Sequence, residues 1–377
     1  MKFIHTADWQ LGMTRHFLSG EAQPRFSGAR LDAVRRIGEL AAEEGCGFVL
    51  VCGDVFESNQ IDRQVLVRAL DAMASTPQVT FYLLPGNHDP LDAASIYRSR
   101  RFREHQPANV VVLESPQPVP VGEGVELVAA PLTSKRPLRD LVDQACTLQE
   151  PTEALRIIAG HGALDSRSPD ADNPALITLA RLEERIEAGE IHYVALGDRH
   201  STTDEGTSSR VWYSGAPEPT DYDEIDPGNV LVVELEPGHI EVRPHRVGTW
   251  TFERHESHLA SDADIDALEE WLASLEDKER TIVKLSAVGQ VSVAQRARLD
   301  RLLELQTDLL AAFEPWERRT DLVVLPDDAD FEVLGLSGFA HEGLCDLRDL
   351  ASSGDDQEAL AARDGLALLH RLSGTAQ

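Results

Sequence analysis

Thr80-Phe-Tyr-Leu-Leu-Pro-Gly-Asn-His-Asp89 is the stretch of this sequence that decides its fold. Its apolar run, residues 81–84, predicts a buried strand, and Pro85-Gly86 predicts a turn directly after that strand. The three polar residues Asn87-His-Asp89 therefore lie at the carboxyl end of the strand, which is where open α/β sheets bind ligands. The stretch predicts a strand with a candidate functional site at its end.

Four further segments repeat this pattern of an apolar run that ends in Asp or His. They are FIHTADWQ, FVLVCGDVFE, LRIIAGHG and HYVALGDRH, which begin at Phe3, Phe48, Leu155 and His192. If the strands lie side by side in parallel, their polar ends meet at one edge of the fold. Asp, Asn and His supply oxygen and nitrogen ligands for divalent metals such as Mn, Fe, Zn or Mg. The five strand ends together predict a metal site.

The order of predicted elements indicates an α/β fold. Apolar residues recur at helical spacing over 29–44 and 62–75, between the first three strands. This β-α-β-α-β order predicts a largely parallel sheet with right-handed crossovers, and the Val-rich segments of 109–131 predict a second sheet. We expect further helices over 137–148, 175–187, 262–275 and 293–313, and further strands over 211–215, 230–242, 281–286 and 321–325.

Length and pattern together predict the domain organisation. A chain of 377 residues is long enough for one large domain and a smaller one. Strand ends of the site type stop near residue 250, so we expect a catalytic domain over 1–250 and an α+β unit over 251–330. The remainder, 331–377, is expected to be a C-terminal segment with a short helix over 357–372.

Composition limits the location and partners of the protein. The sequence has no apolar run of 18 residues, so no membrane span is expected. The first predicted strand leaves no room for a signal peptide, and the four cysteines lack CxxC spacing, which together predict a cytoplasmic protein with reduced thiols. The net charge of −30 argues against a generally basic nucleic-acid-binding surface, although a metal cluster and a few arginines can still form a phosphate site.

Arginines near the third strand end are candidates for phosphate contacts. The segment Tyr97-Arg-Ser-Arg-Arg-Phe-Arg103 follows that strand end, and we predict phosphate contacts for Arg98 and Arg101, with Arg15 as a further candidate. The alternative is a solvated helix face whose arginines pair with surface carboxylates. Trp9 and Tyr97 could stack on bases, with core packing as the alternative.

The five strand ends, in their order, resemble the signature of the calcineurin-like metallophosphoesterases. HTADWQLG (residues 5–12) and YSGAPEPTDYDE (residues 213–224) resemble the Mre11/SbcD-type DNA repair nuclease branch. The resemblance covers residues 1–250. It implies a four-layer α/β/β/α sandwich of two mixed sheets with a smaller α+β capping domain. It also implies DNA as substrate, a homodimer and an SMC-like ATPase subunit as partner.

The resemblance further implies two divalent ions, Mn first, with Mg, Fe or Zn as alternatives. His88 is implied to be the catalytic imidazole, unbound to metal, and Asp89 is expected to orient it or to cap the following turn. Each of these residues alone could be a capping or core residue; the ordered set supports the site. The implied ligands are Asp8 and His200 for the first ion, Asn87 and His161 for the second, and Asp54 for both.

Three positions depart from the family's pattern. Gln10 and Asp198 stand where the family has His, and Glu57 stands where it often has Asp or His. A carboxylate is a good ligand for hard ions, so Asp198 is expected to bind metal and to favour Mn or Mg. Gln10 can bind metal only through its neutral amide oxygen, which should hold the first ion more weakly. Alternatively, it only forms hydrogen bonds near the site.

Three hypotheses about function follow from the sequence. The first is a metal-dependent DNA nuclease, an exonuclease with two metals and a metal-activated water. The second is a phosphodiesterase for small nucleotides, which the overall acidity favours and which this fold also hosts. The third is a catalytically weak scaffold that binds DNA or an ATPase, which the departures at Gln10 and Asp198 motivate.

Overall fold

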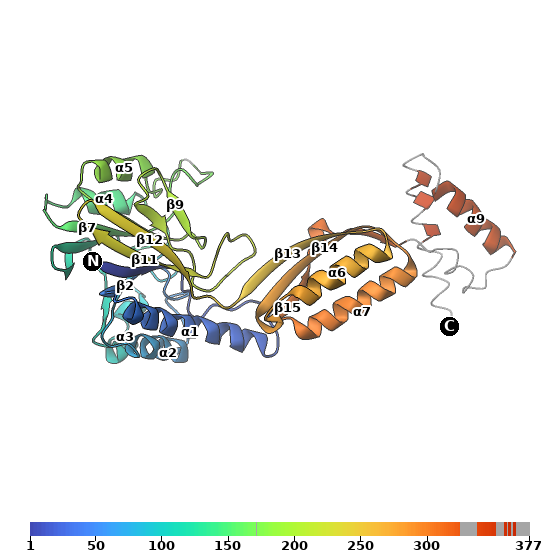
Figure 1. Cartoon of the computed structure of the whole chain (residues 1–377), viewed down its shortest axis with the longest axis horizontal. Helices are drawn as coiled ribbons and strands as arrows, with labels where there is room; N and C mark the ends of the chain where they lie inside the picture. Colours follow the sequence, from blue (N-terminus) through green and yellow to red (C-terminus); the bar gives the residue numbers. More distant parts are fainter. Residues whose placement is uncertain (171, 325–337, 352–357, 360, 363–364, 367–377) are drawn as a thin grey trace. The chain divides into compact units, whose positions relative to one another are not determined.

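The computed structural model describes residues 1–170, 172–324 and 338–351, with 358–359, 361–362 and 365–366 near the C-terminus (Figure 1). The chain divides into two compact units, Met1–Thr251 and Phe252–Gln377. The short helix predicted over 357–372 lies mostly outside the described residues. Each unit has its own hydrophobic core.

The first sheet of the first unit is mixed and six-stranded. Its four central and edge strands β1 to β4 are parallel, whereas β11 is antiparallel to β1 and β12 is antiparallel to β11. The third of these strands, β3, is the one on which the sequence analysis centred. In spatial order the strands are β12 (His239–Arg246), β11 (Asn229–Glu236), β1 (Lys2–Thr6), β2 (Phe48–Cys52), β3 (Thr80–Leu84) and β4 (Val110–Val112).

The second sheet is also mixed and six-stranded. The Val-rich stretch 109–131 was predicted to form this second sheet, but only part of it does. Its first strand, β4, pairs with β3 and extends the first sheet instead. Strands β6, β7, β8 and β10 are parallel, and β5 and β9 are the antiparallel edges. In order the strands are β5 (Val119–Gly122), β6 (Val125–Ala129), β7 (Leu155–His161), β8 (Tyr193–Gly197), β10 (Val211–Tyr213) and β9 (Thr203–Glu205).

The two sheets face one another, and helices cover their outer faces (Figure 1). In β2, Val49 and Val51 pack toward the helices, whereas Phe48 and Leu50 pack toward the second sheet. Both faces are buried, which explains why the strand is wholly apolar. The predicted four-layer α/β/β/α sandwich is confirmed. The covering helices are α1 (Ala22–Glu43), α2 (Arg63–Ala74), η1 (Ile96–Arg98) and α3 (Arg100–His105) on the first sheet, and α4 (Leu141–Thr147) and α5 (Leu179–Glu187) on the second.

Some helix ends differ from those predicted. Helix α1 begins at Ala22 rather than at residue 29, because Pro24 lies in its first turn, where the helix needs no backbone N–H. Helix α4 begins at Leu141 rather than at Pro137, because the side chain of Asp140 caps it by accepting a hydrogen bond of 2.9 Å from the backbone N–H of Asp143.

The second unit is a small α+β structure. Its long strand β14 pairs with β15 along residues 282–285 and with β16 along residues 288–291. The helix predicted over 293–313 ends at Leu309, because Ala312 and Phe313 pair with β14 instead. Helix α9 was not predicted. The elements are β13 (Thr251–Leu259), α6 (Asp262–Ser274), η2 (Lys278–Arg280), β14 (Thr281–Val291), α7 (Val293–Leu309), β15 (Ala312–Pro315), η3 (Glu317–Arg319), β16 (Asp321–Val324) and α9 (Phe339–Ala351).

His5 on β1 is a buried histidine that connects the two sheets. Its Nδ1 lies 3.0 Å from the hydroxyl of Tyr193, and its Nε2 lies 3.1 Å from the carbonyl oxygen of Leu196. A carbonyl can only accept, so Nε2 carries the proton and Nδ1 accepts from the tyrosine. Burial lowers the pKa of His5 to about 3, although the bond to Leu196 raises it slightly.

We expect His5 to make the protein less stable in acid. Between pH 6.5 and 3 the unfolded chain binds a proton at His5 that the folded chain does not, so stability falls as pH falls through this window. At pH 5 the loss is about 2 kcal/mol. Chemical unfolding of His5→Gln at pH 7 and pH 5 should show a correspondingly smaller acid loss than wild type. His239 is exposed, so His239→Gln should lose as much stability in acid as wild type. An equal acid loss in His5→Gln and wild type would contradict the prediction.

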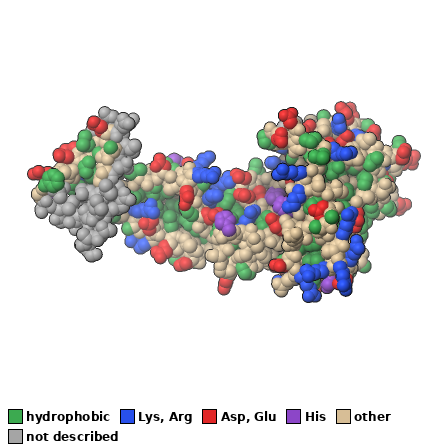
Figure 2. Space-filling view, turned by 180° about the vertical axis from the view of Figure 1, so that it is seen from behind, with side chains coloured by type: hydrophobic (Ala, Val, Ile, Leu, Met, Phe, Trp, Pro, Cys, Tyr) green, Lys and Arg blue, Asp and Glu red, His purple; other side chains and the backbone are tan. Residues whose placement is uncertain are grey.

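The described part of the chain contains no helix that is both long and apolar enough to cross a membrane. All four cysteines are free thiols, as predicted, and three of them, Cys46, Cys52 and Cys146, are buried. Figure 2 shows positive and negative side chains interspersed over the face that it displays.

Candidate metal centre

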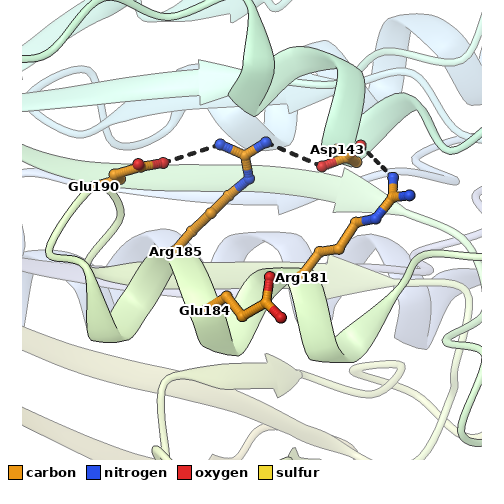
Figure 3. Close-up of a pocket in the computed structure, with 5 residues that line it drawn as sticks. All are labelled: Asp143, Arg181, Glu184, Arg185 and Glu190. Atoms are coloured by element: carbon orange, nitrogen blue, oxygen red, sulfur yellow. Dashed lines mark hydrogen bonds and ion pairs between the residues drawn. The ribbon is translucent and has the colours of Figure 1, made fainter.

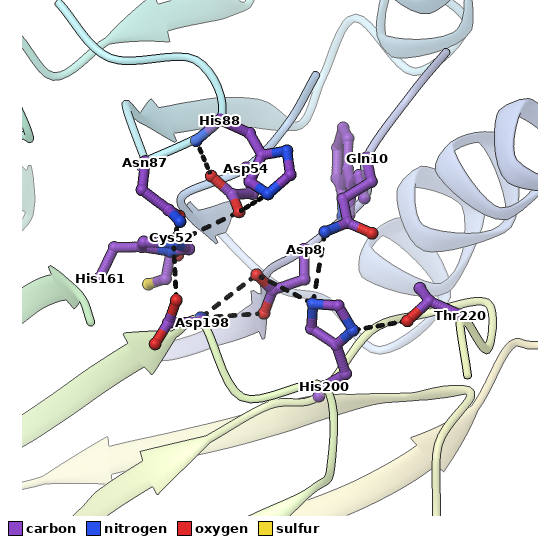
Figure 4. Close-up of polar contacts among 12 residues, drawn as sticks. Asp8, Gln10, Cys52, Asp54, Asn87, His88, His161, Asp198, His200 and Thr220 are labelled. Carbon is purple, nitrogen blue, oxygen red and sulfur yellow. Dashed lines mark hydrogen bonds and ion pairs between the residues drawn. The ribbon is translucent and has the colours of Figure 1, made fainter. Parts of the chain in front are cut away.

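The ends of β1, β2, β3, β7 and β8 bring the candidate ligands to one edge of the sandwich (Figure 4). Asp8 follows β1, Asp54 follows β2, and His161 is the last residue of β7. All three are buried, and one ligand atom of each lies within 4.8 Å of the others. Two carboxylates this close and this poorly solvated favour a proton or a metal cation between them.

The backbone of the loops aims these side chains at one point. The N–H of Asp8 donates to the carbonyl of Gly53 at 3.1 Å, and the N–H of Gln10 donates to the carbonyl of Asp54 at 2.8 Å. Asp8, Gln10, Asp54 and Asp198 have φ values of 55°, 44°, 52° and 95°. Such conformations cost about 1–3 kcal/mol each and are typical of functional sites.

His161 turns its Nε2 toward the carboxylates. Its Nδ1–H donates to the carbonyl of Cys52 at 2.8 Å, which fixes the orientation of the ring. Nε2 then lies 3.5 Å from Oδ2 of Asp54 and 3.8 Å from Oδ1 of Asp198. Asp198, the residue that departs from the family's pattern, therefore lies on the His161 side of the cluster.

The amide of Asn87 completes that side. Its Oδ1 lies 2.7 Å from Nε2 of His161, and the rotated amide would place its nitrogen 3.0 and 3.2 Å from the two carboxylate oxygens of Asp54. In the orientation drawn, either a proton on His161 or a shared cation must lie between the two polar atoms. Asn87 is thus within reach of any ion that Asp54 and His161 bind.

His200 forms the other side of the cluster with Asp8 and Gln10. Its Nε2 lies 3.9 Å from Oδ1 of Asp8 and 3.4 Å from Nε2 of Gln10. Its Nδ1 lies 2.6 Å from the hydroxyl of Thr220 and 3.0 Å from Oε1 of Glu224. A carboxylate that accepts from one ring nitrogen leaves the other free to face a metal.

Glu224 is the functional residue that the sequence analysis missed. It lies in the segment 213–224 that carried part of the resemblance, but no strand end or ligand spacing marked it. Its carboxylate also accepts hydrogen bonds of 3.1 and 2.9 Å from the backbone N–H of Thr220. The loop is therefore organised around this carboxylate, which holds His200 in place.

His88 lies at the edge of the cluster, 36% exposed. Its backbone N–H donates to Oδ1 of Asp54 at 2.9 Å, and its Nδ1–H donates to the carbonyl of Glu57 at 2.9 Å. Its Nε2 is 4.0 Å from Oδ2 of Asp54. Glu57, the third departure, contacts the ring through its backbone and approaches Nδ1 to 3.8 Å with its carboxylate.

Burial and charge strongly shift the acid–base behaviour of these groups. Burial raises the pKa of Asp8 to about 7, although the imidazoles of His200 and His161 lower it. Burial lowers the pKa of His161, but the carboxylate of Asp54 and its neighbours raise it well above its ordinary value. The same imidazole holds the pKa of Asp54 below its ordinary value against the effect of burial. The cluster attracts protons, and a divalent cation would take their place.

The residues present fit divalent metal ions. Carboxylate, amide and imidazole groups are the ligands that Mn, Mg, Fe and Zn accept. Gln10 is buried, and its Oε1 has no hydrogen-bond partner among the described residues. The amide nitrogen of Gln10 faces His200, so the amide would have to rotate before Oε1 could bind an ion of the cluster.

Asp89 and two aromatic residues have structural roles. Asp89 accepts hydrogen bonds from the N–H of Gly86 at 2.8 Å, the N–H of Phe56 at 3.0 Å and the hydroxyl of Tyr97 at 2.6 Å. It therefore ties the loops after β2 and β3 together rather than orienting His88. Trp9 and Tyr97 are buried, as the core-packing alternative expected.

The three candidate arginines differ in their surroundings. Arg15 donates from its guanidinium to the carbonyl of Thr220, next to the loop that holds His200. Arg98 lies 3.9 Å from the carboxylate of Glu114, and Arg101 is exposed on α3. Arg15 is thus connected to the site, whereas the pairing of Arg98 agrees with the solvated-face alternative; their phosphate contacts stay predictions.

A second cluster of charges, on α4 and α5, is internally paired (Figure 3). Arg185 bridges Asp143 at 3.1 Å and Glu190 at 2.9 Å, and Arg181 also binds Asp143 at 2.7 Å. These side chains line a shallow cleft on the outer face of the second sheet. Because the ion pairs satisfy these charges, the cleft has the character of a surface salt-bridge network.

Gly86 is required by the close approach of Asp54. A Cβ at residue 86 would overlap the carboxylate and backbone N of Asp54. We expect Gly86→Ala to lower stability by about 1–3 kcal/mol and to weaken metal binding, because Asp54 must move. Gly28→Ala on α1 meets no atom within 4 Å and should slightly stabilise the protein. Urea unfolding of both variants measures this; equal stabilities would refute it.

Glu224→Gln should weaken metal binding at His200 without removing a ligand. The amide oxygen can still accept from Nδ1, but the charge that strengthens the imidazole as a ligand is lost. We expect about a 10- to 100-fold loss of affinity for one of two ions, measured by calorimetric titration with Mn²⁺. The exposed Glu236→Gln should bind as wild type; a Glu224→Gln titration that matches it would argue against this role.

The calcineurin-like phosphoesterase family matches this chain over residues 1–202, which is more than half of its 377 residues. The chain belongs to this family. A calcineurin-like phosphoesterase uses divalent metals to hydrolyse phosphoesters, and Asp8, Asp54 and His161 are a group that could hold one here. The family assignment predicted from the five strand ends is confirmed.

Curated relatives of this phosphoesterase are components of a nuclease. It is similar to the SbcD component of the nuclease SbcCD of Rhodobacter capsulatus, with 34% identity over 94 residues, and to that of Bacillus subtilis, with 24% identity over 271 residues. The first match covers 24% of this chain and 22% of the relative; the second covers 63% and 67%. These similarities support the predicted SbcD-type branch.

Two solved structures also resemble the phosphoesterase. One is TT1561 of Thermus thermophilus, with a TM-score of 0.40, 11% identity, and coverage of 65% of this chain and 98% of that chain. The other is a dimetal phosphatase from Danio rerio, with a TM-score of 0.41, 12% identity, and coverage of 65% and 96%.

Proposed function

We propose that this phosphoesterase is a metal-dependent DNA nuclease that hydrolyses phosphodiester bonds in DNA repair or end processing. The observation that supports it most directly is the cluster of the buried Asp8, Asp54 and His161 with the more exposed Asp198, His200 and His88 around them. The similarity to components of a nuclease supports DNA as the substrate class.

The geometry suggests two metal positions that share Asp54. Bound divalent ions would stabilise the negative charge of the phosphate and lower the pKa of water. The chain's own part is to hold the ligands in place through the bonds of Cys52 to His161 and of Glu224 to His200. In this proposal the first position comprises Asp8, Gln10 and His200, and the second comprises Asn87, His161 and Asp198.

His88 is the proposed catalytic imidazole. The carbonyl of Glu57 binds its Nδ1–H, so Nε2 faces the cluster; in the protonated ring, Nε2–H can give its proton to the leaving oxygen or stabilise the phosphate. Its exposure leaves room for a substrate on that side. Arg15, Arg98 and Arg101 are proposed to contact the DNA backbone.

Manganese as native metal, the homodimer, an SMC-like ATPase partner and a cytoplasmic location stay predictions. The test of function is incubation of the purified full chain with Mn²⁺ and either single-stranded DNA with free ends or a panel of small phosphodiesters. We expect cleavage of the DNA that EDTA abolishes. Turnover of small phosphodiesters alone would support the nucleotide phosphodiesterase instead, and no turnover of either would support the scaffold hypothesis.

A further inference from the structure

The amide nitrogen of Gln10 contacts Nε2 of His200, the ring nitrogen that faces the cluster. The two Nε2 atoms lie 3.4 Å apart, and His200 is turned this way because Thr220 and Glu224 bind its other nitrogen. A neutral imidazole accepts here from the amide N–H, and a protonated one would be met by the amide oxygen. In both cases the amide forms a hydrogen bond with Nε2 of His200, the atom that a metal ion at this position needs as a ligand.

The rest of the Gln10 side chain is held in a closed environment. Gln10 is only 3% exposed, and its Oε1 is buried without a hydrogen-bond partner among the described residues. To bind an ion, the amide must break its contact with His200 and turn Oε1 toward the cluster. Its NH₂ group then lacks the acceptor that it has now, which opposes the rotation.

On the opposite side the amide of Asn87 also lies 2.7 Å from Nε2 of His161, but two carboxylates face that nitrogen as well. Asp198 places a carboxylate oxygen 3.8 Å from Nε2 of His161, and Asp54 places one at 3.5 Å. An ion there gains two charged oxygens close to Nε2 of His161, whereas the carboxylate oxygen of Asp8 lies 3.9 Å from Nε2 of His200. Anionic oxygen ligands favour hard divalent ions, so this position should bind them more tightly.

We propose that Gln10 makes the two metal positions unequal. The position of His161, Asn87 and Asp198 fills first, and the position of Asp8 and His200 fills only at higher metal concentration, after the amide of Gln10 turns away. This inference rests on the proposed function, because it assumes that the cluster binds two ions. The neutral side chain of Gln10 thereby sets the metal concentration at which the dinuclear centre forms.

The test is Mn²⁺ titration of the metal-free full chain at a fixed, mildly alkaline pH, followed by calorimetry and by electron paramagnetic resonance. For wild type we expect one tight ion with the spectrum of isolated Mn²⁺, and a second ion bound about tenfold or more weakly. The coupled-pair spectrum should appear only with the second ion.

Two variants at Gln10 and one at Asp198 separate the effects of these two residues on the affinities for the first and the second ion. Gln10→His and Gln10→Glu should strengthen the second ion about tenfold or more, so that the coupled spectrum appears at lower Mn²⁺, whereas Asp198→Asn should weaken the first ion. Thermal melts of the metal-free variants identify a variant that does not fold, and the other Gln10 variant then decides.

The outcomes distinguish this inference from the proposed function. Two wild-type ions of equal affinity, or no change in both folded Gln10 variants, overturn the role of Gln10 while leaving a two-metal nuclease intact. A chain that binds no Mn²⁺ at millimolar concentration overturns both. An unequal pair of ions in a chain that cleaves no phosphodiester supports the role of Gln10 and contradicts the nuclease.

Discussion

His88→Ala should lower the rate of phosphodiester hydrolysis about 100- to 10 000-fold, the range that a positioned acid–base group contributes. The side chain is 36% exposed, and its Nε2 lies 4.0 Å from the nearer oxygen of Asp54, so it can reach a substrate that the cluster binds. The backbone N–H of residue 88, which binds Asp54, is kept in the variant. Metal affinity should therefore change little while the rate falls.

This split between rate and metal affinity distinguishes an acid–base role from a structural one. Cleavage of DNA measures the first, and Mn²⁺ titration measures the second. His105→Ala, an exposed histidine on α3, is the matched control and should leave both unchanged. A His88→Ala protein as active as wild type would remove the imidazole from the mechanism; a parallel loss of metal would make it a ligand.

Asp54→Asn should have the largest effect on metal binding. Asp54 approaches His161 to 3.5 Å and His88 to 4.0 Å, and it contributes one of the two carboxylates of the buried triad with His161. The amide keeps the size of the side chain and one acceptor oxygen but removes its charge. Loss of an outer partner of a ligand costs about 10- to 100-fold, so we expect more than about a 100-fold loss of affinity for both ions.

Hydrolysis should fall with the metal, below detection at micromolar Mn²⁺. Asp71→Asn on α2, whose side chain is 78% exposed, is the matched control for removal of one negative charge. If Asp54→Asn still binds two ions as tightly as wild type, Asp54 does not bridge them. Loss of a single ion would assign Asp54 to one position only.

Much of the fold follows from short segments of the sequence. Phe48-Val-Leu-Val-Cys52 and Thr80-Phe-Tyr-Leu-Leu84 form strands at the predicted positions, because an apolar run bounded by Gly or Pro has few other ways to be buried. Where apolar residues fit both a helical and a strand pattern, the predicted secondary structure was wrong. Ala312 and Phe313 continue a helical pattern, but pairing with β14 places them in a strand.

The sequence likewise predicted some residues of the candidate site, whereas others were found only in the tertiary structure. The strand ends alone identified Asp8, Asp54, Asn87, His161 and His200 as neighbours, and the structure brings them together. The role of Asp89 could not be decided from sequence, because Phe56, in the loop after β2, and Tyr97, on η1, donate to it from different parts of the chain. Glu224 was missed for the same reason: its partner His200 precedes it by 24 residues, with β9 and β10 between them.

The stretch at residues 80–89 and its four counterparts determined that the protein is a calcineurin-like phosphoesterase with a cluster of candidate metal ligands, because strand ends are local features of a chain. What surrounds each ligand depended on the tertiary structure. Gln10 and His200 are 190 residues apart, yet their side chains meet 3.4 Å apart at the centre. Only folding brings such partners together, so only the tertiary structure decided that an amide contacts the ring nitrogen of His200 that faces the cluster.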